Sequence, residues 1–187
     1  MNSRLQILSK IQTNKPAQIS LPSIPFFEAN DGSELQFKKA LSLMSGTVKE
    51  LNDYKTIQSF IQNEYSHLTR IASRLPVSTV DINPNTNIQT LDGIELAVIE
   101  AQFGVAENGA IWIEEKDMLH RALPFITQHL AIILNRKNIV ATMHEAYGKT
   151  EPTEYGVFIA GPSKTADIEQ SLVIGAHGAR TLTVLLI

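Results

Sequence analysis

The C-terminal stretch, residues 155–187, constrains the fold more than any other part of the chain. An apolar run, 157–160, stops at a Gly-Pro pair, 161–162, and a second glycine-flanked loop, 175–180, leads into a closing apolar run, 182–187. Apolar runs of this length bounded by glycine and proline are typical of buried strands. The polar residues between the two loops suit a helix start. The stretch therefore predicts a strand, a loop, a short helix, a second loop and a final strand.

The same alternation of helix and strand patterns runs through the rest of the chain. A pair favoured in tight turns, Asn108-Gly109, predicts a hairpin. Together these patterns predict an α/β fold, a mostly parallel sheet with helices on both faces and one inserted antiparallel hairpin. The first two strands flank a helix and are expected to form a βαβ unit. Three helices are expected, which begin after capping residues at 30–33, at 52–53 and at 138; the third ends at Gly148. The expected strands cover residues 46–51, 67–72, 77–82, 95–106, 110–113 and 129–134.

Residues 1–29 are expected to form an N-terminal arm, and residues 30–187 a single domain of ordinary size. In the arm, Leu5, Leu8 and Ile11 recur at helical spacing, and prolines at 16, 22 and 25 prevent a long regular element after them. An apolar arm of this kind either wraps its own domain, which we favour, or reaches a neighbouring molecule.

Composition excludes several classes of function. A formal charge of −3 and a pI near 5.9 provide no broad basic surface, so nucleic acid is not an expected partner. The chain has no cysteine, which excludes a cysteine-ligated iron–sulfur cluster, a disulfide and a thiol nucleophile. The five histidines show no close metal-ligand spacing, so no metal site is expected.

The apolar runs of the chain do not have the pattern of a targeting signal or a membrane span. The first residues lack the uninterrupted apolar core of a signal peptide, and the clearest later run, 130–134, is too short to span a bilayer. We therefore expect a cytoplasmic protein without a membrane span.

The first candidate site is the loop that follows the apolar run 157–160. Thr165 can cap the expected helix, and Asp167 and Glu169 in its first turn suit the positive end of the helix dipole. These carboxylates disfavour a phosphate at the helix start. Helix capping does not explain Gly161, Ser163 and Lys164, a rigid loop that presents a hydroxyl and a cation. We expect this loop to bind a ligand.

The second candidate site is the loop that leads into the final strand. Gly175 can end the expected helix, and Gly178 permits a tight turn. His177 and Arg180 in the same loop offer an acid or base and a bidentate clamp for a carboxylate or phosphate. We expect His177 to be catalytic and Gly178 and Arg180 to bind the ligand, although a structural histidine is the alternative.

The third candidate site is the hairpin turn itself. One interpretation of Glu107, Asn108 and Gly109 is a hairpin turn with a solvated carboxylate. The other is a functional site in which Glu107 is a nucleophile or base. In the functional alternative, Asn108 and Gly109 are expected to contact the ligand.

These motifs resemble the LUD domain family, the family of the lactate-utilisation protein C. Members typically carry Ala-Glu/Asp-Thr-Gly-Thr, then Pro-x-x-His, then Gly-Pro-Ser-x-Thr-Ala-Asp-Ile-Glu, and finally Gly-Val-His-Gly-Pro-Arg. The corresponding stretches here are 106–110, 124–129, 161–169 and 175–180. Asn108 and Ala110 stand where members have threonine, Ala179 stands where they have proline, and the spacing from Pro124 to His129 is longer.

The resemblance implies a fold similar to that of ribose-phosphate isomerases and class I CoA transferases. It also implies that the chain works with two iron–sulfur partner proteins in oxidising L-lactate to pyruvate, with no cofactor bound by this chain. In that case Arg180 and the Ser163–Thr165 loop would hold a small carboxylate such as lactate or pyruvate. The alternative is a stand-alone enzyme similar to class I CoA transferases, which would form an acyl-glutamate at Glu107.

Overall fold

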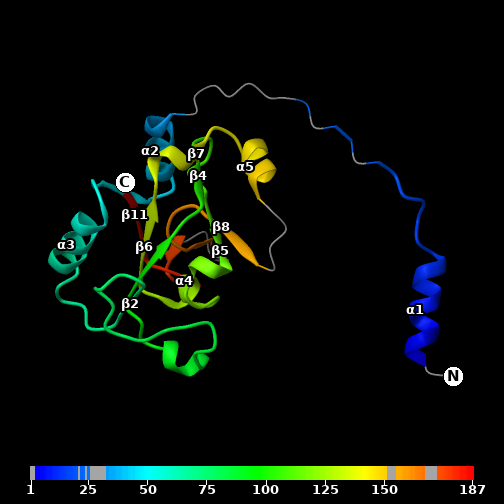
Figure 1. Ribbon diagram of the computed structural model, residues 1–187, viewed down its shortest axis with the longest axis horizontal. Coiled ribbons are helices and arrows are strands. Elements are labelled where there is room, and N and C mark those ends of the chain that lie inside the picture. The colour runs from blue at the N-terminus through cyan, green and yellow to red at the C-terminus, as the bar shows by residue number, and fades with distance from the viewer. Residues whose placement is uncertain (1–2, 21, 24, 26–32, 151–154, 167–171) are drawn as a thin grey trace.

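Five parallel strands form the central sheet of the molecule (Figure 1). The structure is a computed structural model that describes residues 3–20, 22, 23, 25, 33–150, 155–166 and 172–187. All neighbouring strands of this sheet run parallel, as the sequence predicts. In their order across the sheet, the strands are β1 (Thr47–Glu50), β11 (Thr181–Leu186), β6 (His129–Leu134), β3 (Leu96–Glu100) and β2 (Ile71–Ser73).

Both faces of the central sheet are buried, which explains why its inner strands read as continuous apolar runs. Successive side chains of a strand point to opposite faces. In β6, Leu130, Ile132 and Leu134 therefore join one hydrophobic core, and Ala131 and Ile133 join the other.

One helix covers each face of the sheet. On one face α3 (Tyr54–Glu64) buries Ile57 and Ile61, and on the other α2 (Glu34–Leu43) buries Phe37 and Leu41. Both helices begin where the capping residues predict: Ser33 accepts from an amide in the first turn of α2, and Asp53 forms a capping box with Thr56. The predicted arrangement of helices on both faces is confirmed.

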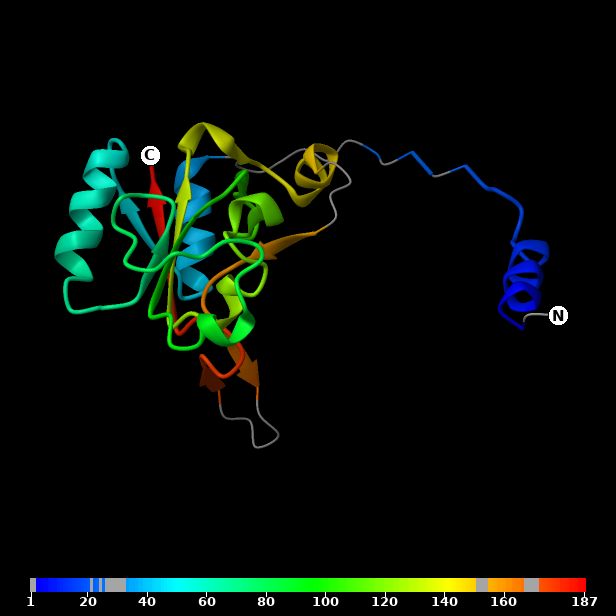
Figure 2. The same ribbon diagram turned by 60° about the horizontal axis from the view of Figure 1, so that its bottom comes forward.

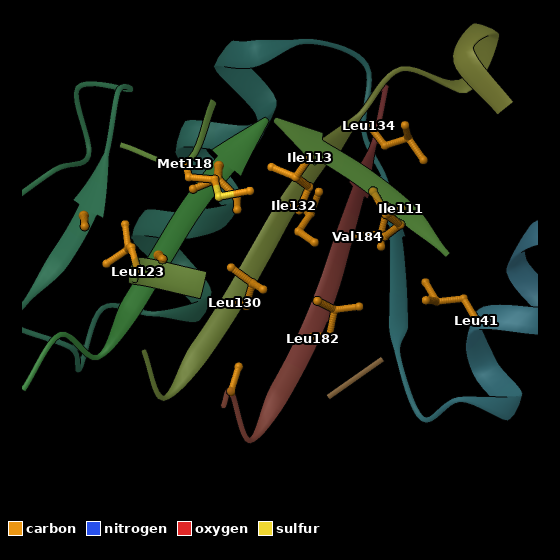
Figure 3. Close-up of a cluster of buried hydrophobic side chains, with 14 of the residues drawn as sticks. Leu41, Ile111, Ile113, Met118, Leu123, Leu130, Ile132, Leu134, Leu182 and Val184 are labelled. Atoms are coloured by element: carbon orange, nitrogen blue, oxygen red, sulfur yellow. The ribbon is translucent and has the colours of Figure 1, made fainter. Parts of the chain in front are cut away.

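A second sheet lies over the same face as α2. Its strands, in spatial order, are β7 (Ile139–Val140), β4 (Phe103–Val105), β5 (Ile111–Glu114) and β8 (Gly156–Ile159). The β4–β5 and β5–β8 pairs are antiparallel, which confirms the predicted hairpin, and the β4–β7 pair is parallel. Figure 3 shows the core between the two sheets, where Ile111 and Ile113 face Leu130, Ile132, Leu182 and Val184. Outside the second sheet, α5 (Met143–Lys149) buries Ala146 against β4 and β7.

Short elements complete the described part of the chain. They are α1 (Ser3–Thr13), α4 (Leu123–Ile126), β9 (Lys164–Ala166), β10 (Leu172–Ile174) and the 3-10 turns at Ile88–Leu91, Glu115–Asp117 and Arg136–Asn138. Figures 1 and 2 both show α1 standing away from the rest of the molecule, and none of its residues is buried. In this structure α1 does not wrap the domain. Among the described residues, no helix is both long and apolar enough to cross a membrane.

The short helix predicted after Gly161 is wrong in the residues that can be described. Thr165 and Gly175 neither cap nor end a helix: 164–166 and 172–174 form an antiparallel hairpin, with Thr165 opposite Val173. β-branched residues at these positions fit a strand well, and their pairing outweighs the local capping pattern. Asp167 and Glu169 lie outside the described residues.

Three further expectations are corrected. β1 and β2 are parallel but stand at opposite edges of the sheet, with three strands between them. Residues 139–140 pair with β4 instead of starting a helix, because Thr142 supplies the cap for α5. The expected strand at 77–82 is absent. Instead, the hydroxyls of Ser78 and Thr79 accept from backbone amides of β2 and so cover its outer edge.

Candidate functional site

The two C-terminal loops named by the sequence are joined through Ser163. The backbone N–H of Ser163 donates to the carbonyl oxygen of Ala179 at 2.9 Å, and the N–H of Gly175 donates to the carbonyl oxygen of Ser163 at 3.0 Å. The β9–β10 pairing extends this contact, with Lys164 opposite Ile174. Gly178 lies against the Ser163 side chain: a Cβ atom on this glycine would stand 3.1 Å from the Ser163 Cβ. The backbone therefore brings the two predicted loops together.

A cavity of about 370 Å³ opens beside the joined loops. Its volume lies at the lower end of the range of small-molecule sites. The apolar part of its wall comes from α4, β6 and β8 and includes Pro124, Phe125, Leu130, Val157 and Ile159. Its polar part consists of six residues predicted from the sequence: Gly161, Ser163, Lys164, Thr165, His177 and Gly178.

The polar part of the wall favours an anion. Lys164 supplies a cation, His177 an imidazole, and Ser163 and Thr165 supply hydroxyls. The side chains of Lys164 and His177 are exposed to solvent. No acidic side chain belongs to the described lining of this cavity. A small carboxylate would therefore meet donors and one positive charge, with no carboxylate competing for them.

Gly161 fixes the position of the first loop against α2. Its φ angle of +85° belongs to the left-handed region, and a Cβ atom there would collide with the carbonyl oxygen of Met44, the residue that ends the helix. Glycine at this position therefore allows the loop to contact the backbone at the C-terminal end of α2. The residue has an architectural role in addition to lining the cavity.

The hairpin turn at Glu107, Asn108 and Gly109 lies outside the described lining of the cavity, and Gly109 approaches α2. Gly109 has a φ angle of +72°, and a Cβ atom there would stand 2.7 Å from the backbone nitrogen of Leu41. The Glu107 carboxylate accepts from the N–H of Met143 at 2.8 Å, and the Asn108 side chain accepts from the N–H of Ala110 at 3.0 Å. In the structure, Glu107 thus satisfies a free amide at the start of α5.

Arg180 and Gly175 contact each other instead of the cavity. The aliphatic part of the Arg180 side chain lies directly over Gly175, and the Arg180 N–H donates to the carbonyl oxygen of Gln128 at 2.8 Å. Neither residue belongs to the described lining of the cavity. Of the predicted site, the structure therefore brings together the Gly161–Thr165 and His177–Gly178 portions. The roles predicted for Glu107 and Arg180 stay predictions.

A second polar group at the amino end of the central sheet was not singled out from the sequence. His129 Nδ1 lies 2.8 Å from Thr181 Oγ1, and its ring centroid is 6.0 Å from that of Tyr65. Burial is the main cause that lowers the pKa of His129 below its ordinary value of 6.5; the neighbouring His67 and Arg180 lower it further, and the nearby Glu95 opposes the shift in part. His129 ends the stretch that corresponds to Pro-x-x-His in the LUD domain family, but its neighbours come from distant parts of the sequence, so no role could be assigned to it.

The apolar wall of the cavity was also missed. Pro124, Leu130 and Val157 lie in three separate elements, and no pattern in the sequence joins them in one site. Within the residues that the structure describes, no group of three or more histidine, aspartate and glutamate side chains could hold a metal ion.

Comparisons with known proteins agree on one family. The model of the LUD domain matches residues 15–187 of the chain. Lactate utilization protein C of Geobacillus kaustophilus is 33% identical over 113 residues, which cover 54% of this chain and 47% of that protein. Lactate utilization protein C of Bacillus pumilus is 29% identical over 109 residues, which cover 54% of this chain and 45% of that protein. The chain therefore matches only about half the length of these curated relatives.

A solved structure supports the fold. The crystal structure of a DUF162 family protein from Deinococcus radiodurans aligns with a TM-score of 0.57 and 15% sequence identity, over 81% of this chain and 94% of that chain. At this identity the similarity concerns the fold alone.

Proposed function

The chain belongs to the LUD domain family, and we propose that it takes part in lactate utilisation by binding a small carboxylate, such as lactate or pyruvate, in the cavity beside Ser163. The relatives named lactate utilization protein C support the pathway. The observation that supports the ligand is the lining of the cavity, where Lys164 and His177 stand beside two hydroxyls and no described lining residue is acidic.

Each polar residue has a distinct part in this proposal. The Lys164 ammonium group attracts the carboxylate as a point charge. The hydroxyls of Ser163 and Thr165 can donate to its oxygens or accept from the hydroxyl of lactate. His177 lies on the second loop and can exchange a proton with the C2 oxygen, which is a hydroxyl in lactate and a carbonyl in pyruvate. The apolar wall receives the methyl group.

Oxidation of lactate to pyruvate also requires an acceptor for two electrons. A chain without cysteine cannot supply a cysteine-ligated cluster. We therefore propose that the electrons pass to iron–sulfur partner proteins, and that this chain binds no cofactor of its own and presents or releases the carboxylate. The proposal predicts no turnover of lactate by the isolated chain.

Thermal unfolding with a panel of ligands tests the proposed binding. L-lactate and pyruvate should raise the Tm in a concentration-dependent way, since a ligand that binds only the folded state stabilises it. Lactamide has nearly the same shape as lactate but no charge and should have no effect. Inorganic phosphate controls for a general anion effect and should stabilise less than lactate. Equal shifts with lactate and lactamide, or none with either acid, would contradict the proposal.

A further inference from the structure

α1 exposes an apolar side that nothing in the described structure covers. The side chains of Leu5, Ile7, Leu8 and Ile11 are 65%, 59%, 49% and 55% exposed. Their spacing gathers them on one broad side of the helix, whereas Gln6 and Lys10 lie on the other. Exposed apolar side chains gathered in this way typically mark an interaction surface.

The length of α1 also indicates that its apolar side packs against another surface. α1 has 11 residues, and isolated helices shorter than about 12 to 15 residues are marginal in water. Most of the stability of such a helix comes from packing of its apolar face. We therefore expect α1 to be stable when that face is packed against another surface.

The charge of the N-terminal arm indicates which surface α1 packs against. Residues 1–27 contain Arg4, Lys10 and Lys15 and no acidic residue, a formal charge of +3. The whole chain has 16 basic and 19 acidic residues, so the rest of it holds 13 basic and 19 acidic residues, a formal charge of −6. The arm is thus complementary in charge to the domain of its own sequence. Two α1 helices, in contrast, would repel each other.

The segment behind α1 favours a neighbouring molecule over the chain's own domain. Prolines at positions 16, 22 and 25 restrict their own φ angles and disfavour helical conformations in the residues before them. Proline-rich segments act as extended spacers of about 3 Å per residue. Figures 1 and 2 show α1 away from the domain of its own chain.

We propose that α1 docks through Leu5, Leu8 and Ile11 onto the acidic α/β domain of a second copy of this chain, forming a dimer by exchange of arms. The mouth of the cavity is not the docking surface, since Lys164 would repel the basic helix. The family match begins at residue 15, so α1 lies outside it, and the docking is independent of the proposed ligand.

Sedimentation equilibrium of the full chain tests the assembly. The full chain should form dimers whose dissociation constant rises with salt, because the contact includes opposite charges. Leu8→Gln and Ile11→Gln should each weaken the dimer about tenfold or more, through lost apolar burial. Gln6→Ser, on the opposite side of the helix, should leave it unchanged. A monomer at all concentrations, or a dimer indifferent to both apolar substitutions, would overturn the proposal.

Zero-length cross-linking of a mixture of isotopically heavy and light chains identifies the acceptor. A carbodiimide should join Lys10 or Lys15 to carboxylates of residues 33–187 in mixed heavy–light peptide pairs. Pairs formed within one chain only would place the helix on its own domain and overturn the proposal. Cross-links confined to the arms of two copies would do the same. Far-UV circular dichroism of each variant confirms that the domain is folded.

Discussion

The backbone N–H of Ser163 donates to the carbonyl oxygen of Ala179 at 2.9 Å, and the carbonyl oxygen of Ser163 accepts from the N–H of Gly175. This relationship explains why two sequence motifs form one site. The Ser163 side chain and the His177–Gly178 segment line the same cavity as a consequence. A change that separates these two backbones should therefore remove the site even where every polar side chain is kept.

Gly161→Ala should destabilise the protein. The added Cβ atom would collide with the Met44 carbonyl oxygen at a φ angle of +85°, and such strain costs about 2 kcal/mol or more. Urea unfolding monitored by circular dichroism measures the free energy of unfolding.

Gly148→Ala is the matched control for Gly161→Ala. Gly148 lies within α5, and a Cβ atom there would meet no atom within 4 Å. Because alanine favours a helix more than glycine does, this change should stabilise the protein by about 0.5–1 kcal/mol. Equal effects of the two substitutions would contradict the close approach of the first loop to Met44.

Phe158→Leu should alter the fluorescence of Trp112. The protein has one tryptophan, and its ring centroid lies 4.6 Å from that of Phe158. Loss of the aromatic contact should cost about 1–2 kcal/mol of the free energy of unfolding. The emission maximum should shift to longer wavelength as water approaches the indole. Phe125→Leu, at the cavity wall, should leave the emission maximum unchanged.

Glu107→Ala should weaken α5, whereas Glu107→Gln should not. The Glu107 carboxylate accepts from the N–H of Met143 at 2.8 Å, and a glutamine side chain keeps an acceptor oxygen. Loss of this hydrogen bond should cost about 0.5–1.5 kcal/mol. Thermal unfolding of both variants measures the difference.

The same pair of variants tests the alternative function. If Glu107 were the nucleophile of a CoA transferase, incubation with acyl-CoA and trapping with hydroxylamine would modify the unaltered chain. The modification would vanish in Glu107→Gln as well as in Glu107→Ala. Our account predicts no modification of any of the three proteins by intact mass.

His129 should make stability depend on pH. Its pKa is lower in the folded protein than its ordinary value of 6.5, so the unfolded chain binds the proton more readily. Its contribution to stability is therefore fully present above pH 6.5 and is lost as the pH falls below that value. His129→Gln should lose less stability than the unaltered protein between about pH 7.5 and about pH 5.5 in urea unfolding. Equal losses would contradict the assignment.

Local chemistry explains the parts of the fold that could be predicted from the sequence. Ser33 and Asp53 start α2 and α3 because a cap is made by residues within one turn of each other. The continuous apolar run at 129–134 is the central strand β6, since a strand buried on both faces cannot alternate in polarity.

Contacts between distant residues explain what could not be predicted. A polar segment followed by Thr165 is compatible with a helix start and with a hairpin. The hairpin is favoured by contacts such as the Ser163–Ala179 hydrogen bond, whose partners are far apart in the sequence. The cavity wall joins Pro124, Leu130 and Val157 from three elements. No local pattern marks these residues as neighbours, so the polar half of the site could be predicted and its apolar half could not.

Isothermal titration of the full chain with L-lactate tests the central claim most directly, that a small carboxylate binds beside Lys164. The unaltered protein and Lys149→Met, which removes an exposed lysine from the end of α5, should bind lactate with the same dissociation constant. Lys164→Met should raise that constant about tenfold or more, a loss of about 1.4 kcal/mol, because the cation that faces the carboxylate is gone. Equal affinities of the Lys164→Met and Lys149→Met proteins, or no binding of lactate by the unaltered chain, would contradict the account.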